Sequence, residues 1–261
     1  MAVTSVPGWI GQSAVNETGE RWMQAAGIKL RLGSAFWMST MAGRSVEITI
    51  TLGSNHNYDR NDLINKLRAL GSTPAVVVIS GDLVAQNTGV PCLEFPSNLP
   101  NEYVHLRVNA NIYGRGGQGG TAGVNVGQNG GPCILNSFGT RLRIENNGAI
   151  CGGGGGGGGA RVGKNLASGG SGGRPFGPAG LGEGRDSKNG IAGTLAAPGP
   201  QPPNTRYGSH GGAGGDVGRA GAPGNKAGDQ AEGYVGGQPG AAVYGNAPTW
   251  IKVGSVYGSR V

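Results

Sequence analysis

The chain has 261 residues, of which 57 are glycine and 15 are proline, and its formal net charge is +7. Only 36% of the residues are hydrophobic and 13% are charged, a composition that excludes an ordinary enzyme-like globule. Residues 1–111 hold 10 glycines and as many acidic as basic residues, whereas residues 112–261 hold 47 glycines and the whole net positive charge. The sequence therefore predicts two physically different parts, and the second is suited to an anionic partner.

The first 43 residues are apolar without a clear period, and they hold three of the four tryptophans, Trp9, Trp22 and Trp37. Tryptophan and methionine are enriched where proteins meet proteins, because each brings a large contact area to an interface. We expect this segment to dock onto another molecule. Burial of the tryptophans in a core of their own is the alternative.

A strand and a helix are predicted next. Residues 45–52 (SVEITITL) alternate apolar and polar side chains with the period of a half-buried strand. Residues 59–70 place their leucines and isoleucine on one face of a helix, which Asp59 or Asn61 can cap at its start. Gly71 stands where a left-handed residue often ends a helix.

Further strands are predicted from β-branched and alternating runs. Residues 74–80 (PAVVVIS) are typical of a buried strand, residues 103–112 alternate again, and residues 141–150 (RLRIENNGAI) hold a strand and an NNG turn. The fold class expected from these patterns is a small α+β domain over residues 1–112, followed by a glycine-rich domain over residues 113–261.

The glycine-rich part cannot build a conventional hydrophobic core. Eight consecutive glycines occupy positions 152–159, and residues 152–239 contain only eight Val, Ile, Leu or Phe side chains. Such a segment is either disordered or packed through its backbone, as extended threefold helices of about 3.1 Å rise per residue whose neighbours approach closely because they lack side chains. The runs expected to form parallel rods are 114–120, 152–159, 169–184, 208–215 and 236–240, joined by loops at their ends.

Short motifs in this part resemble chemical signatures by composition alone. Residues 114–119 match GxGxxG, but no helix or acidic residue follows at the required distance, so no cofactor is predicted. Residues 169–173 match GxSxG without the strand-to-helix elbow that gives this motif its meaning. No acid/base pair stands out either, and we expect no enzymatic activity.

The histidines and cysteines indicate no metal site. His56, His105 and His210 are far apart, and Cys92, Cys133 and Cys151 have neither metal-ligand nor disulfide-framework spacing. We interpret the cysteines as reduced, unreactive thiols. The N-terminus has no secretion signal and no stretch is long and apolar enough to span a membrane, so synthesis in a cytoplasm is expected.

Several longer motifs occur together in this chain: MAVTSVPGWIGQSAVNETGERWM, YGRGGQGG, RLRIENNGAICGGGGGGGG and GGRPFGPAG. In combination they resemble the receptor-recognising adhesins at the tip of the long tail fibre of T-even-like bacteriophages, over the whole chain. The resemblance implies an N-terminal domain that caps a trimeric fibre protein and a C-terminal sandwich of polyglycine II helices with variable tip loops. It also implies a place at the fibre tip of the virion. The residues expected to attach to the fibre are Trp9, Ile10, Trp22, Phe36 and Trp37.

The variable loops of that family bind a bacterial outer-membrane receptor, so the resemblance implies a porin-type protein and/or lipopolysaccharide as partner, and neither nucleic acid nor a small-molecule substrate. In this chain the loops would fall at 121–129, 161–168, 183–207, 216–222 and 225–235. Aliphatic and aromatic residues would serve as anchors, and basic residues would meet acidic porin loops or phosphates. The residues chosen are Val124, Asn125, Val126, Arg161, Lys164, Leu166, Arg185, Lys188, Leu195, Arg206, Tyr207, Lys226 and Tyr234.

Two other functions are compatible with the composition. A polyglycine II ice-binding protein would need a flat face of regularly repeated small residues. A glycine-rich RNA-binding or disordered interaction protein would need dense Arg and aromatic repeats, whereas residues 113–117 (YGRGG) supply a single such element.

Overall fold

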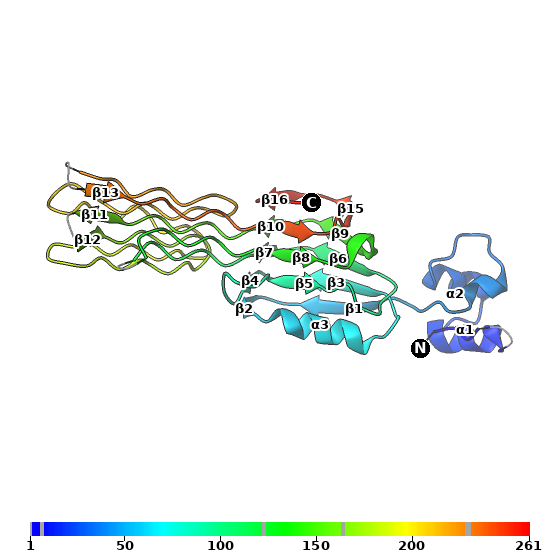
Figure 1. The fold of residues 1–261 in the computed structure, drawn as a ribbon. Coiled ribbons are helices and arrows are strands. Elements are labelled where there is room, and N and C mark those ends of the chain that lie inside the picture. The colour runs from blue at the N-terminus through cyan, green and yellow to red at the C-terminus, as the bar shows by residue number, and fades with distance from the viewer. Residues whose placement is uncertain (1, 6–7, 122–123, 163–164, 228–230) are drawn as a thin grey trace.

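The computed structural model describes residues 2–5, 8–121, 124–162, 165–227 and 231–261. Three parts follow one another along the molecule (Figure 1). A helical lobe contains the described part of residues 2–45. A strand body contains residues 46–113, 132–151 and 241–261. A glycine lattice, built from the remaining described residues, extends from the body on the side opposite the lobe (Figure 1).

The helical lobe contains α1 (Ile10–Thr18), α2 (Met23–Lys29) and a short 3-10 helix, η1 (Met38–Met41). Its small core consists of the buried side chains Val3, Ala14, Ala26, Leu30 and Met41. The tryptophans are not part of this core. Each of them occupies the position just before one of the three helices.

The strand body is a stack of parallel turns. Its first sheet is ordered β1 (Ile48–Leu52), β3 (Ala75–Ile79), β6 (Val104–Val108), β9 (Leu142–Asn146) and β15 (Thr249–Lys252). Its second sheet has the complementary order β16 (Ser255–Tyr257), β10 (Ala149–Cys151), β7 (Asn111–Tyr113), β4 (Leu83–Ala85) and β2 (Asn55–Tyr58). A third sheet contains β14 (Val243–Gly245), β8 (Ile134–Asn136) and β5 (Leu93–Phe95). Fully buried Leu, Ile and Val residues from all three sheets fill one core.

The predicted helix is confirmed as α3 (Arg60–Ala69). Asp59 caps it, since its side chain accepts a hydrogen bond from the backbone amide of Asn61 at 2.9 Å. Leu63 and Leu67 are buried against the strand core. Gly71 follows the helix with φ +56, as expected for a left-handed position.

The long strand predicted over residues 103–112 is wrong, because it is two strands in different sheets. The chain leaves β6 at Val108, bends through Asn109 and Ala110, and enters β7 in the second sheet. The same bend, at residues 147–148, separates β9 from β10. Alternation continues on both sides of each bend, so local periodicity does not reveal it.

The bends belong to an internal repeat that the sequence analysis did not find. Val104 pairs with Leu142 in the first sheet, and Ile112 pairs with Ile150 in the second, so the two segments keep one register through the bend. The glycine runs then begin at Gly114 and Gly152, at equivalent places. Each glycine run therefore begins a long segment that leaves the strand body after a strand of the second sheet. The chain re-enters the body at a strand of the third sheet.

The strands do not follow the expected division after residue 112. Strands β8, β9 and β10 pair with β5, β6 and β7, and strands β14, β15 and β16 extend the same three sheets by pairing with β8, β9 and β10. The chain enters the lattice from β7 and from β10 and returns both times to the third sheet (Figure 1). The predicted division into domains 1–112 and 113–261 stays a prediction. Strands from residues 113–261 nevertheless form part of all three sheets that begin in residues 1–112.

The glycine lattice is held by hydrogen bonds between extended segments. Successive amides of residues 153–159 point to different neighbours, and every third amide meets the same neighbouring segment again. One neighbour accepts through Arg219 and Ala222, a second through Gly131, Gln128 and Asn125, and a third through Arg174 and Ser171, with N···O distances of 2.7–3.0 Å.

Glycine is required here by space. A Cβ atom on any residue from Gly152 to Gly158 would overlap a carbonyl oxygen of a neighbouring segment. The lattice therefore satisfies its buried backbone groups as a β-sheet does, but in three directions.

Candidate functional site

The lattice ends in a set of loops farthest from the strand body (Figure 1). We call the described parts of residues 121–126, 160–168, 183–189, 205–209 and 225–233 the distal loops. Strands β11 (Ala160–Val162), β12 (Asn165–Ser168) and β13 (Ala231–Gly233) form a small antiparallel sheet among them. Backbone contacts join the loops to one another: Gly159 donates to Asn125, Ser168 bridges to Lys188, and His210 bridges to Asn225.

Apolar side chains project from this end. Val124 is 58% exposed, Val126 is 44% exposed and Tyr207 is 55% exposed. Asn125, between the two valines, is half-buried, and its carbonyl accepts the Gly159 amide. The expected anchors in the 121–126 and 205–209 loops are therefore brought to one end of the molecule, on backbone that the lattice holds.

The distal loops also present basic side chains. Arg185, Lys188 and Lys226 are exposed. Arg206 lies 3.6 Å from the Asp186 carboxylate, and its guanidinium stands 5.1 Å from the ring of Tyr207. The ion pair links the 183–189 loop to the 205–209 loop, and the cation–π contact lies within the 205–209 loop.

The remaining candidates in the distal loops are more constrained. Arg161 is half-buried in β11. Tyr234 is half-buried, and its hydroxyl donates to Glu232 at 2.6 Å. Lys164 lies outside the described residues, as does the side chain of Leu166.

Parts of two expected binding regions lie at the end of the lattice next to the strand body, away from the distal loops. Leu195, chosen as an exposed anchor, is half-buried and packs against the cluster of Val84, Tyr113, Cys151 and Val217 beside the strand body. The segment 216–222 begins with a turn at the same end, where Gly218 donates to Gly152. Rods that follow one another in the chain run in opposite directions, so alternate loops return to the strand body. Composition alone does not tell the two ends apart.

Sequence reasoning also missed two exposed side chains at the borders of the distal loops. Leu181 is 57% exposed and Val235 is 63% exposed. Each stands beside a glycine run. An isolated large apolar residue next to such a run is the signal that would have found them.

The tryptophans of the helical lobe form the second exposed apolar region. Trp9 is 89% exposed, Trp22 is 80% exposed and Trp37 is 82% exposed. Ile10 and Phe36, which were expected beside them, are instead half-buried against the core of the lobe. Three nearly bare indoles on one small lobe are far more than a soluble surface normally shows.

The cysteines are placed in buried, apolar surroundings. Cys92, Cys133 and Cys151 are free thiols, each at most 2% exposed. Burial raises the pKa of the Cys151 thiol to about 12, and burial also raises the pKa of Cys92 and of Cys133 above the ordinary value of a thiol. Since the thiolate is the nucleophile, none of these groups is poised to react near neutral pH.

Among the described residues, no cluster of three or more metal-ligating side chains occurs, and no helix is long and apolar enough to cross a membrane.

Comparisons with known proteins match nearly the whole chain. The family model described as "Phage tail fibre adhesin Gp38" matches residues 46–261, and that described as "Phage tail fibre adhesin Gp38 N-terminal domain" matches residues 1–42. The chain is 46% identical over 254 residues to the receptor-recognizing protein gp38 of Salmonella phage S16, covering 96% of this chain and 97% of that protein.

A solved structure is similar to the whole chain as well. It is described as the gp37-gp38 adhesin tip complex of the bacteriophage S16 long tail fiber, and it matches with a TM-score of 0.79, 43% identity and full coverage of both chains. Together with the two family models, these similarities show that the chain belongs to the Gp38 family of phage tail fibre adhesins.

Proposed function

We propose that the chain is a non-enzymatic adhesin that sits at the distal tip of a long tail fibre and recognises a receptor on the host bacterium. The observation that carries this proposal is the exposed apolar and basic surface of the distal loops, displayed on a hydrogen-bonded lattice. The relative from phage S16 is named a receptor-recognizing protein. Membership of the family favours this function over ice binding and RNA binding.

The extended segments of the lattice are, in this proposal, a sandwich of polyglycine II helices. Support comes from the triplet pattern of the hydrogen bonds, because a helix with three residues per turn repeats its contacts every third residue. Such a scaffold lets the loop residues change while the glycine segments stay fixed. Because the loop ends are already ordered, little conformational entropy remains to be lost on binding.

The helical lobe is the proposed attachment to the fibre. A complex of gp37 and gp38 forms the adhesin tip of the S16 fibre, and we infer that a trimeric fibre protein covers Trp9, Trp22 and Trp37 in the same way. Tryptophans that lie bare in the isolated chain would then be buried at the centre of an interface. The lobe and the distal loops lie at opposite ends of the molecule, so attachment leaves the loops free (Figure 1). The assembled protein belongs to the virion and is made in the host cytoplasm.

The proposed receptor is an outer-membrane protein of the porin type and/or lipopolysaccharide. The exposed cations Arg185, Lys188 and Lys226 fit the acidic loops or phosphate groups that such receptors present. Val124, Val126 and Tyr207, which are exposed on the same set of loops, supply apolar anchors. Several fibres on one particle would add avidity to a modest single-site affinity.

Cell binding tests this function directly. The labelled chain, produced together with its fibre tip, is added to wild-type enterobacterial cells and to strains that lack single outer-membrane proteins or the lipopolysaccharide outer core. Saturable binding that disappears in one strain is expected and identifies the receptor. Absence of binding to every strain, including the natural host of the phage, would contradict the proposal.

Variants separate the two ends of the molecule. Combined replacement of Val124, Val126 and Tyr207 by alanine should abolish cell binding and leave assembly with the fibre intact. The double variant Trp22→Ala and Trp37→Ala should lose assembly with the fibre and keep cell binding by the free chain, because these side chains lie in the helical lobe. Equal loss of cell binding for free, monomeric chains of both variants would contradict the assignment of the distal loops.

A further inference from the structure

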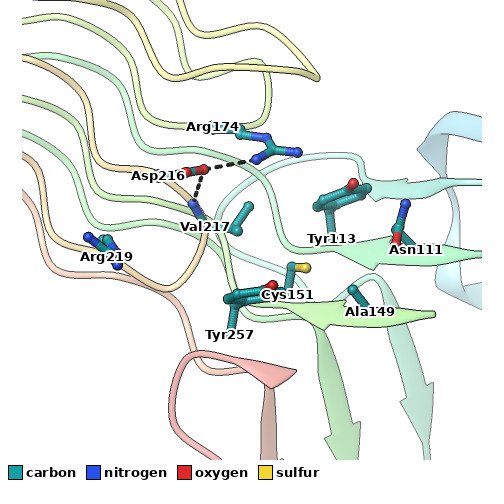
Figure 2. Close-up of a pocket in the computed structure, with 9 residues that line it drawn as sticks. All are labelled: Asn111, Tyr113, Ala149, Cys151, Arg174, Asp216, Val217, Arg219 and Tyr257. Atoms are coloured by element: carbon teal, nitrogen blue, oxygen red, sulfur yellow. Dashed lines mark hydrogen bonds and ion pairs between the residues drawn. The ribbon is translucent and has the colours of Figure 1, made fainter. Parts of the chain in front are cut away.

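A cavity of about 480 Å³ lies where the lattice joins the strand body. Its walls come from the ends of β7, β10 and β16 and from two crossings of the lattice, at Arg174 and at residues 216–219. Figure 2 shows Arg174 and Asp216 on one side of it and Tyr257 with Cys151 on the other. It is far from the distal loops, so the proposed receptor surface does not include it (Figure 1).

One of the two arginines that line the cavity has no partner among the described residues. The Arg174 guanidinium donates to the Asp216 carboxylate at 3.0 Å and to the Leu195 carbonyl at 2.7 Å, so these two charges neutralise each other. Arg219 lies in the same wall and is exposed. Within the described residues, its side chain has no hydrogen bond or ion pair. An anionic group entering the cavity would therefore find one cation that has no other partner.

Hydrogen-bond acceptors line the cavity beside this cation. The backbone amide and Nδ2 of Asn111 both donate to Asp82, each at 3.0 Å, and no described group donates to the Oδ1 of Asn111. Asp216 uses its Oδ1 for Arg174 and for the amide of Val217, and its Oδ2 receives no hydrogen bond from described residues. A bare anion offers only acceptors, so it would satisfy Arg219 but leave both oxygens without a donor.

The remaining lining is apolar or aromatic. Ala149, Cys151 and Val217 cover part of the wall, and the rings of Tyr113 and Tyr257 stand on either side of Cys151 (Figure 2). Tyr113 is almost fully buried, whereas the ring of Tyr257 is 48% exposed and borders the opening. Such a surface suits a ligand with one apolar face and polar groups at its edge.

The geometry points to this cavity as a binding site for an acidic saccharide unit, a pyranose ring that carries a phosphate or a carboxylate. The anionic group binds Arg219, hydroxyl groups donate to Asn111 and Asp216, and the C–H face of the ring packs on Tyr257. The volume is within the range of small-molecule sites, about 300–1,000 Å³, and exceeds what a lone ion needs. The site extends the proposed function, because it would contact surface glycans from the base of the lattice.

Binding of small probes to the full-length chain tests this site. Glucose 6-phosphate, glucuronic acid, glucose and inorganic phosphate are compared by saturation-transfer NMR and calorimetry. Both acidic sugars should bind, and glucose and inorganic phosphate should each bind about tenfold more weakly, because each lacks half of the contacts. Preference for glucose 6-phosphate over glucuronic acid would point to phosphorylated sugars as the natural source, and the opposite preference to uronic acids.

Two variants and a matched control locate the binding. Arg219→Ala should weaken binding of both acidic sugars about tenfold, since it removes a charge-assisted hydrogen bond. Tyr257→Ala should weaken binding of glucose and of both acidic sugars severalfold, by about the same factor for each. Arg68→Ala, which removes an exposed arginine of α3 that does not line the cavity, should change nothing. Thermal unfolding checks that each variant is folded, and Arg219→Lys, which keeps the charge, should retain most of the binding.

The proposal is overturned if neither acidic sugar binds saturably to the wild-type chain. Equal binding of glucose and glucose 6-phosphate would also overturn it, as would equal losses for Arg219→Ala and Arg68→Ala. Because these experiments use no cells and none of the distal residues, their failure leaves the proposed receptor surface untouched.

Discussion

The strand body and the glycine lattice solve the same packing problem with opposite means. The body buries large side chains such as Leu106, Ile134 and Phe95 between three sheets. The lattice removes its side chains and pairs backbone groups with neighbours in several directions, as the amides of residues 152–159 show. The difference teaches that glycine, usually a flexible residue, forms a rigid scaffold when nearly every amide and carbonyl finds a partner. The two regions should therefore respond to mutation in different ways.

The largest effect is expected for a methyl group added inside the lattice. In Gly156→Ala, the new Cβ would overlap the Gln118 carbonyl and force neighbouring segments apart. We expect a loss of about 3 kcal/mol or more in the free energy of unfolding, since the clash also weakens surrounding hydrogen bonds. Chemical denaturation measures this loss. Gly53→Ala is the control, because its Cβ would meet nothing within 4 Å, and an equal loss there would contradict the comparison.

In the strand body, the removal of side-chain atoms from the core should lower the free energy of unfolding. Leu106 is fully buried between β3 and β9, so Leu106→Ala leaves a cavity in the core. We expect a loss of about 2–5 kcal/mol, measured by the same denaturation experiment. Leu181→Ala, which truncates an exposed side chain of the lattice, should lie within about 0.5 kcal/mol of the wild type. A large effect at Leu181 would show that the lattice also relies on side-chain burial.

The cap of α3 offers a smaller, local test of the body. Asp59 accepts from the amide of Asn61, and Asp59→Ala removes this bond. The expected loss is about 1 kcal/mol, the usual value for an N-cap residue. Asp59→Ser should recover most of it, because a serine hydroxyl also caps a helix. A Ser variant no better than the Ala variant would indicate that the aspartate acts in another way.

The smallest effect on stability is expected at the distal loops. Tyr207 is exposed and contacts Arg206, so Tyr207→Ala should change the free energy of unfolding by less than about 0.5 kcal/mol. Cell binding should nevertheless fall clearly, since aromatic residues dominate binding energies. Loss of stability together with loss of binding would mean that the loops help to hold the lattice.

Local patterns in the sequence predicted elements well and their assembly less well. The helix at 60–69 and its cap followed from side-chain periodicity and capping chemistry, which act within one segment. The stacked parallel turns depend on pairings such as Val104 with Leu142, which join residues far apart in the chain. A search for the repeated pattern that ends in a glycine run at Gly114 and again at Gly152 would have indicated them.

The binding surface was predictable in kind but only partly in place. Loops between glycine runs were expected to hold the exposed apolar and basic residues, and Val124, Tyr207 and Lys188 are found at the distal end. Leu195 stands in a segment of similar, glycine-rich composition, but it lies beside the strand body. The end at which a loop lies depends on the direction of its rods, and only the three-dimensional arrangement gives that direction.

Hydrogen–deuterium exchange of the full-length chain is the most direct test of the lattice. Peptides that cover residues 152–159 should exchange as slowly as those from β6, because each amide in this run donates to a neighbouring segment. Peptides from the 183–189 loop should exchange much faster. Rapid exchange of residues 152–159 in a folded chain would show that the glycines are not held by their backbone, and it would contradict the account of a rigid scaffold that presents the distal loops.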